Sequence, residues 1–361
     1  MTDNSKTQTK KAEVPRAKDH GVLYIGMDLG TSRTAISASN GVRESMFSIV
    51  GYPKDHVSRK MLGKDRLFGQ EAIDKRLSLQ FLRPLESGVL KSVGGGKDKV
   101  DPDASRAAKD LIQEAIRIAK PRKDELIYCV VGAPAQASIH NKEAIVNAAR
   151  ASVDSVMLCS EPFAVAYGLD MLDDVLVIDI GAGTVDLCRM HGTMPEEADQ
   201  ITLDLGGDAV DLKLMDLLSK TCAGADFTVQ MVREMKERYS FLGDPIERAV
   251  VELPVEGKPT EFDITDQIGR ACSIIVDPIV EGLNKLVATF DPEFQHKLRQ
   301  RVLLAGGGSQ IKGLDTAIEE AMKRDVGGGK VIRIGEPLFG GANGALKIAH
   351  DMPEDYWEKL R

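Results

Sequence analysis

One motif occurs twice in this chain, at positions separated by about the length of a domain. Residues 22–34 read VLYIGMDLGTSRT and residues 174–186 read DVLVIDIGAGTVD. Each is an apolar run rich in β-branched residues that ends in Asp-x-Gly and continues into a turn of small residues. Each copy therefore predicts a β-hairpin whose bend carries no large side chain.

A bend of this kind is suited to binding phosphate, because glycine leaves the backbone N–H groups open to approach. The aspartates at the two strand ends, Asp28 and Asp179, are suited to holding Mg²⁺ through water, with the ion bridging the phosphates. Two such hairpins facing each other across a cleft would hold a nucleoside triphosphate from both sides. A single copy is more often only a tight turn, and the repetition favours the binding interpretation.

A third glycine-rich segment strengthens this interpretation. Residues 301–314 read RVLLAGGGSQIKGL, in which a strand leads into glycines whose flat backbone can lie against a purine ring or an α-phosphate. Two GGGK strings, at 94–97 and 327–330, are not Walker A loops. Lys91 and Arg324 stand where that motif needs its first glycine, and no Ser or Thr follows the Lys.

Composition limits the possible functions. The chain has 361 residues, enough for two domains, and 43% of them are hydrophobic, which supports an ordinary core. The net charge of −8 argues against binding to a nucleic-acid backbone, and against adhesion to an anionic membrane. No apolar run approaches the roughly 20 residues that span a bilayer.

Several segments and residue types predict no special chemistry. Residues 1–20 are polar, carry five Lys or Arg and lack the apolar part of a signal peptide, so we expect a disordered tail. The five cysteines form no CxxC pair and mostly lie in apolar stretches, which predicts buried free thiols in the cytoplasm. The six histidines show no HxxxH or HExxH pair, so we expect no structural zinc site.

Strand-like and helical segments alternate along the chain, which predicts an α/β architecture. We expect strands at 22–28, 126–131, 155–159, 174–179 and 301–305, and helices at 104–119, 139–151, 208–219, 228–238, 266–290 and 312–323.

This alternation predicts two similar α/β lobes with a nucleotide cleft between them. Lobe I is expected to contain 21–170 and 335–361, and lobe II to contain 171–334. Segments 51–97 and 224–263 are richer in Pro, Gly and charge, so we expect them to form smaller inserted subdomains at the mouth of the cleft.

Six motifs, taken in order, resemble those of the actin/Hsp70/sugar-kinase superfamily. They are DLGTSRT, SEPFAVAYGLD at 160–170, DIGAGTVDL, LDLGGDAVD at 203–211, AGGGSQIKGL and FGGANGAL at 339–346. Each is weak alone, but together they span the chain from about residue 22 to 350. The resemblance implies an actin-like fold, with two ribonuclease H-like α/β lobes around the cleft.

The resemblance also implies roles for individual residues. Asp28 and Asp179 would position Mg²⁺ largely through water, and Glu161 and Asp179 would act catalytically by orienting or activating the attacking water. The residues expected to contact ATP or ADP are Gly30, Thr31, Ser32, Gly181, Ala182, Gly183, Gly207, Lys236, Glu237, Gly307 and Gly308. Actins often have Asp where this chain has Ala182, so one polar contact is expected to be absent.

Two of these assignments have simpler alternatives. Glu161 precedes Pro162 at an expected helix start, where a carboxylate interacts favourably with the helix dipole without any catalytic role. Its place after a strand, opposite a γ-phosphate, instead favours activation of an in-line water. Lys236 and Glu237 are adjacent on the expected helix at 228–238, and such a charged pair is often only solvated.

Within the superfamily the chain resembles the bacterial actins. Local strings such as VGYPKD at 50–55, DQITL at 199–203 and MPEDYWEKL at 352–360 resemble the members that organise magnetosomes. The resemblance implies a cytoplasmic cytoskeletal filament of copies of this chain, with open-ended assembly and turnover driven by ATP hydrolysis. Adaptor proteins associated with magnetosomes would then attach it along the magnetosome chain.

Three alternatives remain open on the sequence. A small-molecule kinase would need a substrate-side aspartate, for which we find no candidate. A chaperone-type ATPase would need a further domain after residue 350, whereas a monomeric regulatory ATPase would not. A membrane-binding actin would use an amphipathic terminal helix. The C-terminal DMPEDYWEKLR is short and acidic, so we expect its Tyr-Trp pair to pack on the fold and expect no direct membrane insertion.

Overall fold

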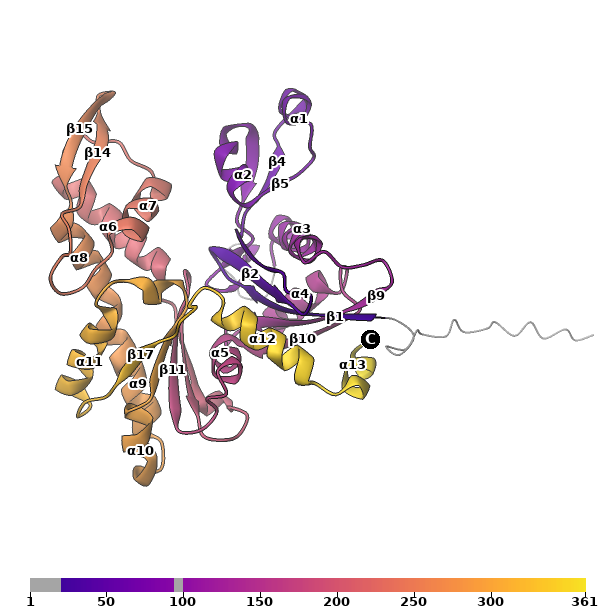
Figure 1. The fold of residues 1–361 in the computed structure, drawn as a ribbon. Helices are drawn as coiled ribbons and strands as arrows, with labels where there is room; N and C mark the ends of the chain where they lie inside the picture. The colour runs from indigo at the N-terminus through magenta and orange to yellow at the C-terminus, as the bar shows by residue number, and fades with distance from the viewer. Residues whose placement is uncertain (1–20, 94–99) are drawn as a thin grey trace, which may run out of the picture.

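The computed structural model describes residues 21–93 and 100–361. The predicted tail at 1–20 and the GGGK string at 94–97 lie outside these residues. Two five-stranded sheets form the centres of the two halves of the molecule (Figure 1). We call each sheet, with the elements packed on it, a lobe. The residue boundaries given above for the two lobes stay predictions.

The sheet of lobe I has the strand order β10-β9-β1-β2-β3. Its strands are β1 (Gly21–Leu29), β2 (Arg33–Ala38), β3 (Arg43–Phe47), β9 (Glu125–Ala133) and β10 (Ser155–Ser160). β1 pairs parallel with β9 and antiparallel with β2, so the sheet is mixed and β1–β2 is the first hairpin that the sequence predicts.

The sheet of lobe II repeats this arrangement in the order β13-β12-β11-β16-β17. Its strands are β11 (Val175–Ile180), β12 (Val185–Met190), β13 (Gln200–Leu203), β16 (Val302–Ala305) and β17 (Val331–Arg333). β11 pairs antiparallel with β12 and parallel with β16, so β11–β12 is the second predicted hairpin. All six residues of β11 are buried, as expected of a strand covered on both faces.

Helices cover both faces of the lobe I sheet. They are α3 (Pro102–Ile118) and α4 (Ile139–Ala149), with α5 (Glu161–Gly168), α12 (Gly340–Asp351) and α13 (Glu354–Leu360). Alternate residues of β1 enter two different cores: Leu23 and Ile25 pack with α3, whereas Tyr24 packs with α12 and α13. Sequence explains the start of α3, because Asp101 caps it by accepting from the Asp103 N–H and Pro102 is its first residue.

The helices of lobe II are α6 (Gly207–Thr221), α7 (Val229–Tyr239), α8 (Thr265–Cys272), α9 (Val276–Ala288), α10 (Pro292–Arg299) and α11 (Leu314–Asp325). The single helix predicted at 266–290 is wrong, because a 3-10 turn at Ser273–Ile275 separates α8 from α9. Pro278 has no N–H to donate to the Ile274 carbonyl, and its ring crowds that carbonyl, so α-helical bonding cannot run through the turn.

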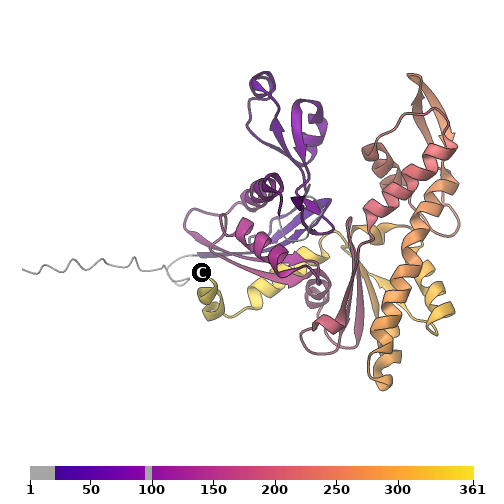
Figure 2. The ribbon, with the colours of Figure 1, turned by 180° about the vertical axis from the view of Figure 1, so that it is seen from behind.

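A smaller group of elements extends from each lobe on the same side of the molecule, as Figures 1 and 2 show. The group on lobe I contains β4 (Val50–Pro53), α1 (His56–Leu62), β5 (Leu67–Phe68), α2 (Gly69–Asp74) and β6 (Leu79–Leu82). It encloses its own apolar cluster around Ile49, Leu67 and Leu79. The short hairpin of β7 (Leu85–Glu86) and β8 (Val89–Leu90) follows it. On lobe II, the hairpin of β14 (Val250–Val255) and β15 (Lys258–Asp263) extends beside α7.

Two helices join the lobes, and they touch backbone to backbone. A Cβ added at Gly344 of α12 would lie 1.7 Å from the Ala164 carbonyl oxygen of α5. A Cβ at Gly168 would lie 2.9 Å from the Gly344 Cα. The contact between α5 and α12 therefore requires glycine, since any side chain would force the helices apart.

The C-terminal helix α13 is fixed by Trp357. Its fully buried ring stacks on Tyr128 with ring centroids 5.0 Å apart. Its indole N–H donates to the Ala349 carbonyl. The predicted packing of the Tyr-Trp pair is confirmed for Trp357 but wrong for Tyr356, which is 46% exposed. Among the described residues, no helix is both long enough and apolar enough to cross a membrane.

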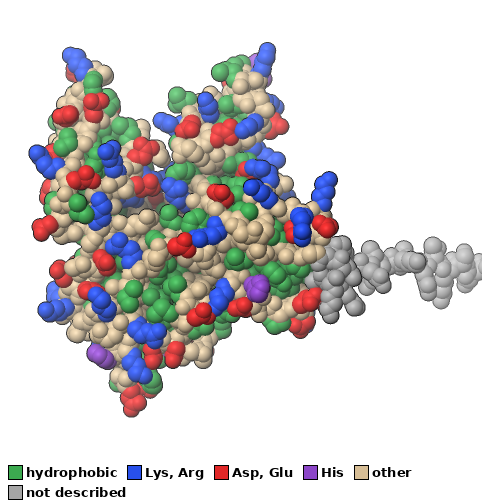
Figure 3. All heavy atoms as spheres, viewed as in Figure 1, with side chains coloured by type: hydrophobic (Ala, Val, Ile, Leu, Met, Phe, Trp, Pro, Cys, Tyr) green, Lys and Arg blue, Asp and Glu red, His purple; other side chains and the backbone are tan. Residues whose placement is uncertain are grey.

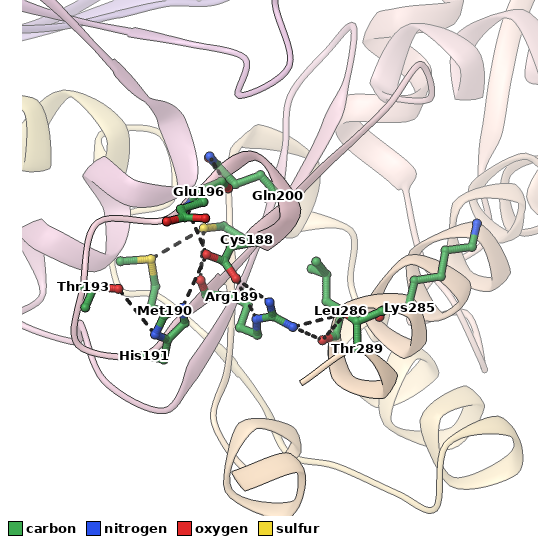
Figure 4. Close-up of polar contacts among 11 residues, drawn as sticks. Cys188, Arg189, Met190, His191, Thr193, Glu196, Gln200, Lys285, Leu286 and Thr289 are labelled. Carbon is green, nitrogen blue, oxygen red and sulfur yellow. Dashed lines mark hydrogen bonds and ion pairs between the residues drawn. The ribbon is translucent and has the colours of Figure 1, made fainter. Parts of the chain in front are cut away.

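A buried ion pair lies at the end of β12 in lobe II (Figure 4). The Arg189 guanidinium contacts the Asp199 carboxylate, and its Nη1 donates to the Leu286 carbonyl of α9 at 2.6 Å. Burial alone would raise the pKa of Asp199, but the Glu196 N–H and Arg189 hold that pKa below its usual value. This contact ties the end of β12 to α9.

Four of the five cysteines are buried, namely Cys129, Cys188, Cys222 and Cys272, whereas Cys159 is partly buried. All five are free thiols, as predicted. Burial raises the pKa of the Cys129 thiol to about 12. These thiols are therefore protonated at neutral pH and pack as small apolar groups.

Candidate functional site

A cleft of about 420 Å³ separates the two lobes, within the size range of ligand pockets. Figure 3 shows the hollow between the two upper groups of elements. Every site residue that the sequence predicts lines this cleft: Asp28, Gly30, Thr31, Ser32, Glu161, Asp179, Gly181, Ala182, Gly183, Gly207, Lys236, Glu237, Gly307 and Gly308. The structure thus brings them together, while their individual roles stay predictions.

The bends of the two hairpins share one geometry. In the first, the Gly30 N–H donates to the Arg33 carbonyl at 3.1 Å; in the second, the Gly181 N–H donates to the Thr184 carbonyl at 2.9 Å. Within residues 21–93 and 100–361, the next two N–H groups of each bend have no acceptor; they belong to Thr31, Ser32, Ala182 and Gly183. Paired free N–H groups of this kind form an anion-binding nest.

The two bends also approach each other closely. A Cβ added at Gly183 would lie 2.7 Å from both the Thr31 hydroxyl and the Ser87 Cα. The Gly88 N–H donates to the Thr31 hydroxyl at 2.8 Å. The β7–β8 turn, with left-handed backbone at Ser87 and Gly88, is therefore held between the bends, and glycine is required at 183.

The first turn of α6 supports the second bend from behind. The Gly207 N–H donates to the Gly181 carbonyl at 3.0 Å, and the Asp208 N–H donates to the Ala182 carbonyl at 2.8 Å. Lys236 continues this support, because its ammonium donates to the Gly207 carbonyl and pairs with Asp211, both at 2.7 Å.

The Lys236 side chain is only 14% exposed. It is therefore not a freely solvated charge. Its neighbour Glu237 is exposed at the cleft.

A cluster of carboxylates lies at the base of the cleft. Burial raises the pKa of Asp28 to about 6. Burial, followed by the charges of Asp28, Asp186 and Asp179, raises the pKa of Glu161 well above its usual value. Burial, then Asp28 and Asp186, raises the pKa of Asp179 as well. These acids lower each other's tendency to ionise, so the cluster favours a nearby cation.

Mg²⁺ fits this cluster only if water or phosphate completes its shell. Nowhere in the described part of the chain are three His, Cys, Asp or Glu side chains arranged to hold a metal ion directly. Asp28 and Asp179 border the cleft next to the free N–H groups of the bends. They are thus placed to hold the waters of an ion bound to phosphate, as Mg²⁺ prefers.

Glu161 is the first residue of α5, directly after β10, with Pro162 next. Its carboxylate borders the cleft and forms no hydrogen bond or ion pair with the described residues. A Cβ at Gly132 would lie 3.2 Å from the Glu161 Cγ, so glycine there leaves space for the side chain. A carboxylate without a protein partner at this place is suited to contacting a bound water.

Sequence reasoning missed Asp186, on β12 opposite Asp179. It is 1% exposed and accepts hydrogen bonds from the Thr202 hydroxyl at 2.5 Å, the Thr184 hydroxyl at 2.9 Å and the Ala135 N–H at 3.3 Å. These bonds lower the pKa of Asp186, but burial outweighs them and raises it. Its place in the DIGAGTVD string was a signal, because the second Asp of that string faces the first across the hairpin.

Sequence reasoning also missed the ion pairs and the apolar wall of the cleft. Arg233 pairs with Asp208 at 2.5 Å and with Asp211 at 3.0 Å. Ile275, Ile311, Pro337 and Leu338 line the cleft near Gly307 and Gly308, which provides an apolar surface for a planar base. Gly306 belongs to the same glycine run, and a Cβ there would lie 2.3 Å from an Asp179 carboxylate oxygen.

Comparison with known proteins agrees with this fold and cleft. The family model described as MreB/Mbl protein matches residues 23–354. The chain therefore belongs to the MreB/Mbl family of actin-like proteins, and the predicted actin-like fold is confirmed.

Two relatives are similar to the chain over nearly their whole length. It is 37% identical over 338 residues to the actin-like protein MamK of Paramagnetospirillum magneticum, covering 94% of this chain and 95% of the relative. It is 36% identical to MamK of Magnetospirillum gryphiswaldense, covering 94% and 92%.

Solved structures of MamK are similar as well. The MamK double helical filament matches with a TM-score of 0.88 at 36% identity, covering 92% of this chain and 100% of the other. A non-polymerising MamK mutant bound to AMPPNP matches with a TM-score of 0.69 at the same identity and coverage.

Proposed function

We propose that this chain binds ATP with Mg²⁺ in its cleft, assembles head to tail with copies of itself into filaments, and hydrolyses the ATP. The observation that carries the nucleotide site is the pair of matching bends, whose free N–H groups line one cleft beside buried carboxylates. The filament is supported by the likeness to MamK, which has been solved as a double helical filament.

Different residues of the cleft would have different roles in hydrolysis. The free N–H groups of the two bends would bind the β- and γ-phosphates and orient the terminal phosphorus. Mg²⁺, when bound, would neutralise phosphate charge. Asp28 and Asp179 would fix its position through water. Ile275, Ile311 and Leu338 would contact the base and exclude water from one end of the cleft.

Glu161 would accept a proton from the attacking water, for which its carboxylate must be ionised. In the protein alone, burial and three neighbouring acids oppose that ionisation. Positive charge near Asp28 and Asp179 reverses this balance. The base would thus become active only when the cleft is loaded, which limits proton abstraction to the bound state.

We further propose that the filament lies in the cytoplasm along the magnetosome chain and is attached there by adaptor proteins. Similarity to the MamK proteins of Paramagnetospirillum magneticum and Magnetospirillum gryphiswaldense supports this place of action. A fluorescent fusion expressed in a magnetosome-forming cell that lacks its own filament actin tests the proposal. Linear structures along the magnetosomes are the expected result.

Pelleting and negative-stain microscopy with Mg·ATP, Mg·ADP or no nucleotide test the filament and the hydrolysis together. We expect filaments with Mg·ATP. Glu161→Gln should slow phosphate release by at least about 100-fold, the usual contribution of a general base, and give filaments that persist longer. The exposed Glu358→Gln on α13 is a matched control. A chain that hydrolyses ATP but stays monomeric in every condition would instead indicate a monomeric ATPase or a kinase.

A further inference from the structure

The segment after β9 reaches from lobe I to the edge strand of lobe II. Gln136 makes the contact. Its side-chain amide nitrogen donates to the Gln200 carbonyl at 3.0 Å, and its amide oxygen accepts from the Thr202 N–H at 3.2 Å. A residue of a parallel neighbouring strand makes the same two bonds, to residues on either side of its partner. One side chain thus pairs with the edge of β13.

The same segment is also connected to the carboxylate cluster. The Gln136 main-chain N–H donates to the Thr202 hydroxyl at 3.4 Å, and that hydroxyl donates to Asp186 at 2.5 Å. The neighbouring Ala135 N–H donates directly to the same carboxylate oxygen at 3.3 Å. Asp186 therefore belongs to lobe II but is held partly by groups of lobe I.

Asp186 does not line the cleft, so it acts through its neighbours. It lies opposite Asp179 in the β11–β12 hairpin. Its charge also contributes to the raised pKa of Glu161. Any shift of the Asp186 carboxylate therefore changes the electrostatic surroundings of both proposed catalytic acids.

These bonds depend on the relative position of the lobes. The segment around Gln136 follows a strand of one sheet, whereas Gln200 and Thr202 lie on the other sheet. A rotation of one lobe against the other would stretch the bonds that Ala135 and Gln136 make to lobe II, whereas the bond from the Thr202 hydroxyl to Asp186 lies within lobe II. The contact can form only when the two sheets are as close as they are here.

We propose that Gln136 is a positioning residue: it clasps the two lobes together below the cleft and holds Asp186 in the orientation that Glu161 and Asp179 need for hydrolysis. This inference rests on the proposed hydrolysis in the cleft. Gln136 does not line the cleft, so we expect it to affect the hydrolysis of bound ATP rather than the binding of the nucleotide.

Three variants distinguish the contributions of the individual hydrogen bonds. Gln136→Met keeps the length of the side chain without its hydrogen bonds. Gln136→Glu keeps an acceptor for the Thr202 N–H but cannot donate to the Gln200 carbonyl. Thr202→Val removes the hydroxyl that connects the segment to Asp186. The control is Gln295→Met on α10, whose amide donates to the Phe290 carbonyl at 3.0 Å, within lobe II.

Three measurements apply to the full chain: AMPPNP affinity, the single-turnover rate of hydrolysis of bound ATP, and hydrogen exchange of residues 200–203 with AMPPNP bound. We expect Gln136→Met and Thr202→Val to slow the turnover roughly tenfold, equivalent to the loss of one or two hydrogen bonds. AMPPNP affinity should change less than roughly threefold. Exchange at Thr202 should accelerate in Gln136→Met. Gln136→Glu should be intermediate, and Gln295→Met unchanged.

A folded Gln136→Met that hydrolyses bound ATP at the unmodified rate would overturn the inference. So would an equal loss in affinity and rate, which indicates a change in cleft shape only. If Gln136→Met does not fold, Gln136→Glu and Thr202→Val carry the same test. If the unmodified chain does not hydrolyse ATP, the proposed function fails, whereas the exchange measurement still shows whether the clasp forms.

Discussion

The two hairpins share a bend but differ in what holds it. The first carries side chains: the Thr31 hydroxyl accepts from the Gly88 N–H, and the Ser48 hydroxyl donates to the Gly30 carbonyl at 2.6 Å. The second carries almost none, and the main chain at the start of α6 supports it instead. A similar local sequence produces the same turn twice, but the surroundings decide which atoms hold it in place.

The difference follows from how the lobes meet. Thr31 occupies the space that a side chain at Gly183 would need. Only one of the two bends can carry a side chain at this contact. The second bend therefore has glycine at this contact because the first bend has threonine there. Substitutions should affect the two bends unequally.

The largest effect is expected for Gly183→Ala. The new Cβ would lie 2.7 Å from the Ser87 Cα and the Thr31 hydroxyl. The bends must therefore separate, and a displacement of about 1 Å in a catalytic site costs about 100-fold in rate. Phosphate release with saturating Mg·ATP measures this loss. Gly335→Ala, in open space, should keep the full rate. A fully active Gly183→Ala would show that the bends separate before hydrolysis.

The next effect concerns the two aspartates and pH. Burial raises the pKa of Asp28 to about 6, and that of Asp179 is raised too. The folded state then binds more protons than the unfolded state above about pH 4, so stability falls as the pH rises through about 6. Thermal unfolding without nucleotide, from pH 5 to pH 8, should show this decline.

Asp28→Asn and Asp179→Asn should each make stability depend less on pH. The effect of Asp179→Asn should be larger, because Asp179 is the more buried of the two. Each variant should also raise the unfolding temperature at pH 8 while reducing the stabilisation by Mg·ATP. The exposed Asp355→Asn should leave the pH dependence unchanged. If the unfolding temperature falls equally steeply with pH in all variants, groups other than Asp28 and Asp179 cause the pH dependence.

Thr31→Val should have a smaller effect on stability. It leaves the Gly88 N–H without its acceptor, and an unsatisfied buried N–H costs about 1–3 kcal/mol. Urea unfolding of the protein without nucleotide measures this change. Thr31→Ser, which keeps the hydroxyl, should be close to the unmodified protein. In the second bend, the Thr184 hydroxyl donates to Asp186 within the same hairpin, so no side chain there holds the bend to another segment as Thr31 does.

Ser32→Ala should have the smallest effect. Its N–H, rather than its hydroxyl, is the group expected to bind phosphate, and the substitution keeps that N–H. The affinity for a fluorescent ATP analogue should stay within roughly threefold, which is less than 1 kcal/mol. A tenfold loss would show that the first bend binds phosphate through side chains, which would deepen its difference from the second.

The sequence predicts local features best. The two bends, the alternating strands and the cap of α3 depend on residues that are neighbours in the chain. The site residues were found for the same reason, since most belong to short strings around the bends and the glycine run. One local feature was still overlooked: the apolar period runs on through 273–278, but Pro278 interrupts the helical bonding.

The remaining features depend on partners far along the chain. Nothing near Gln136 indicates that its amide pairs with β13, some 65 residues later. Arg233 reads as a surface charge on an amphipathic helix, but it is 5% exposed and paired with two aspartates of α6. Tertiary contacts of this kind leave no periodic pattern in the sequence.

The glycine contact between α5 and α12 has a mechanical consequence. The two backbones meet at one point, between Gly344 and Ala164, and beyond it the Tyr167 hydroxyl of α5 donates to Asp351 of α12. We therefore expect a change of angle between the helices to pivot about this backbone contact. The outer tips formed by α1 and by β14–β15 lie far from it (Figure 1). Asp28, beside the first bend, lies close to α12, since a Cβ added at Gly341 would lie 3.0 Å from its carboxylate. A small rotation at the backbone contact becomes a large displacement at the tips. If the bound nucleotide changes this angle, a neighbouring subunit bound at the tips would be displaced without contacting the cleft.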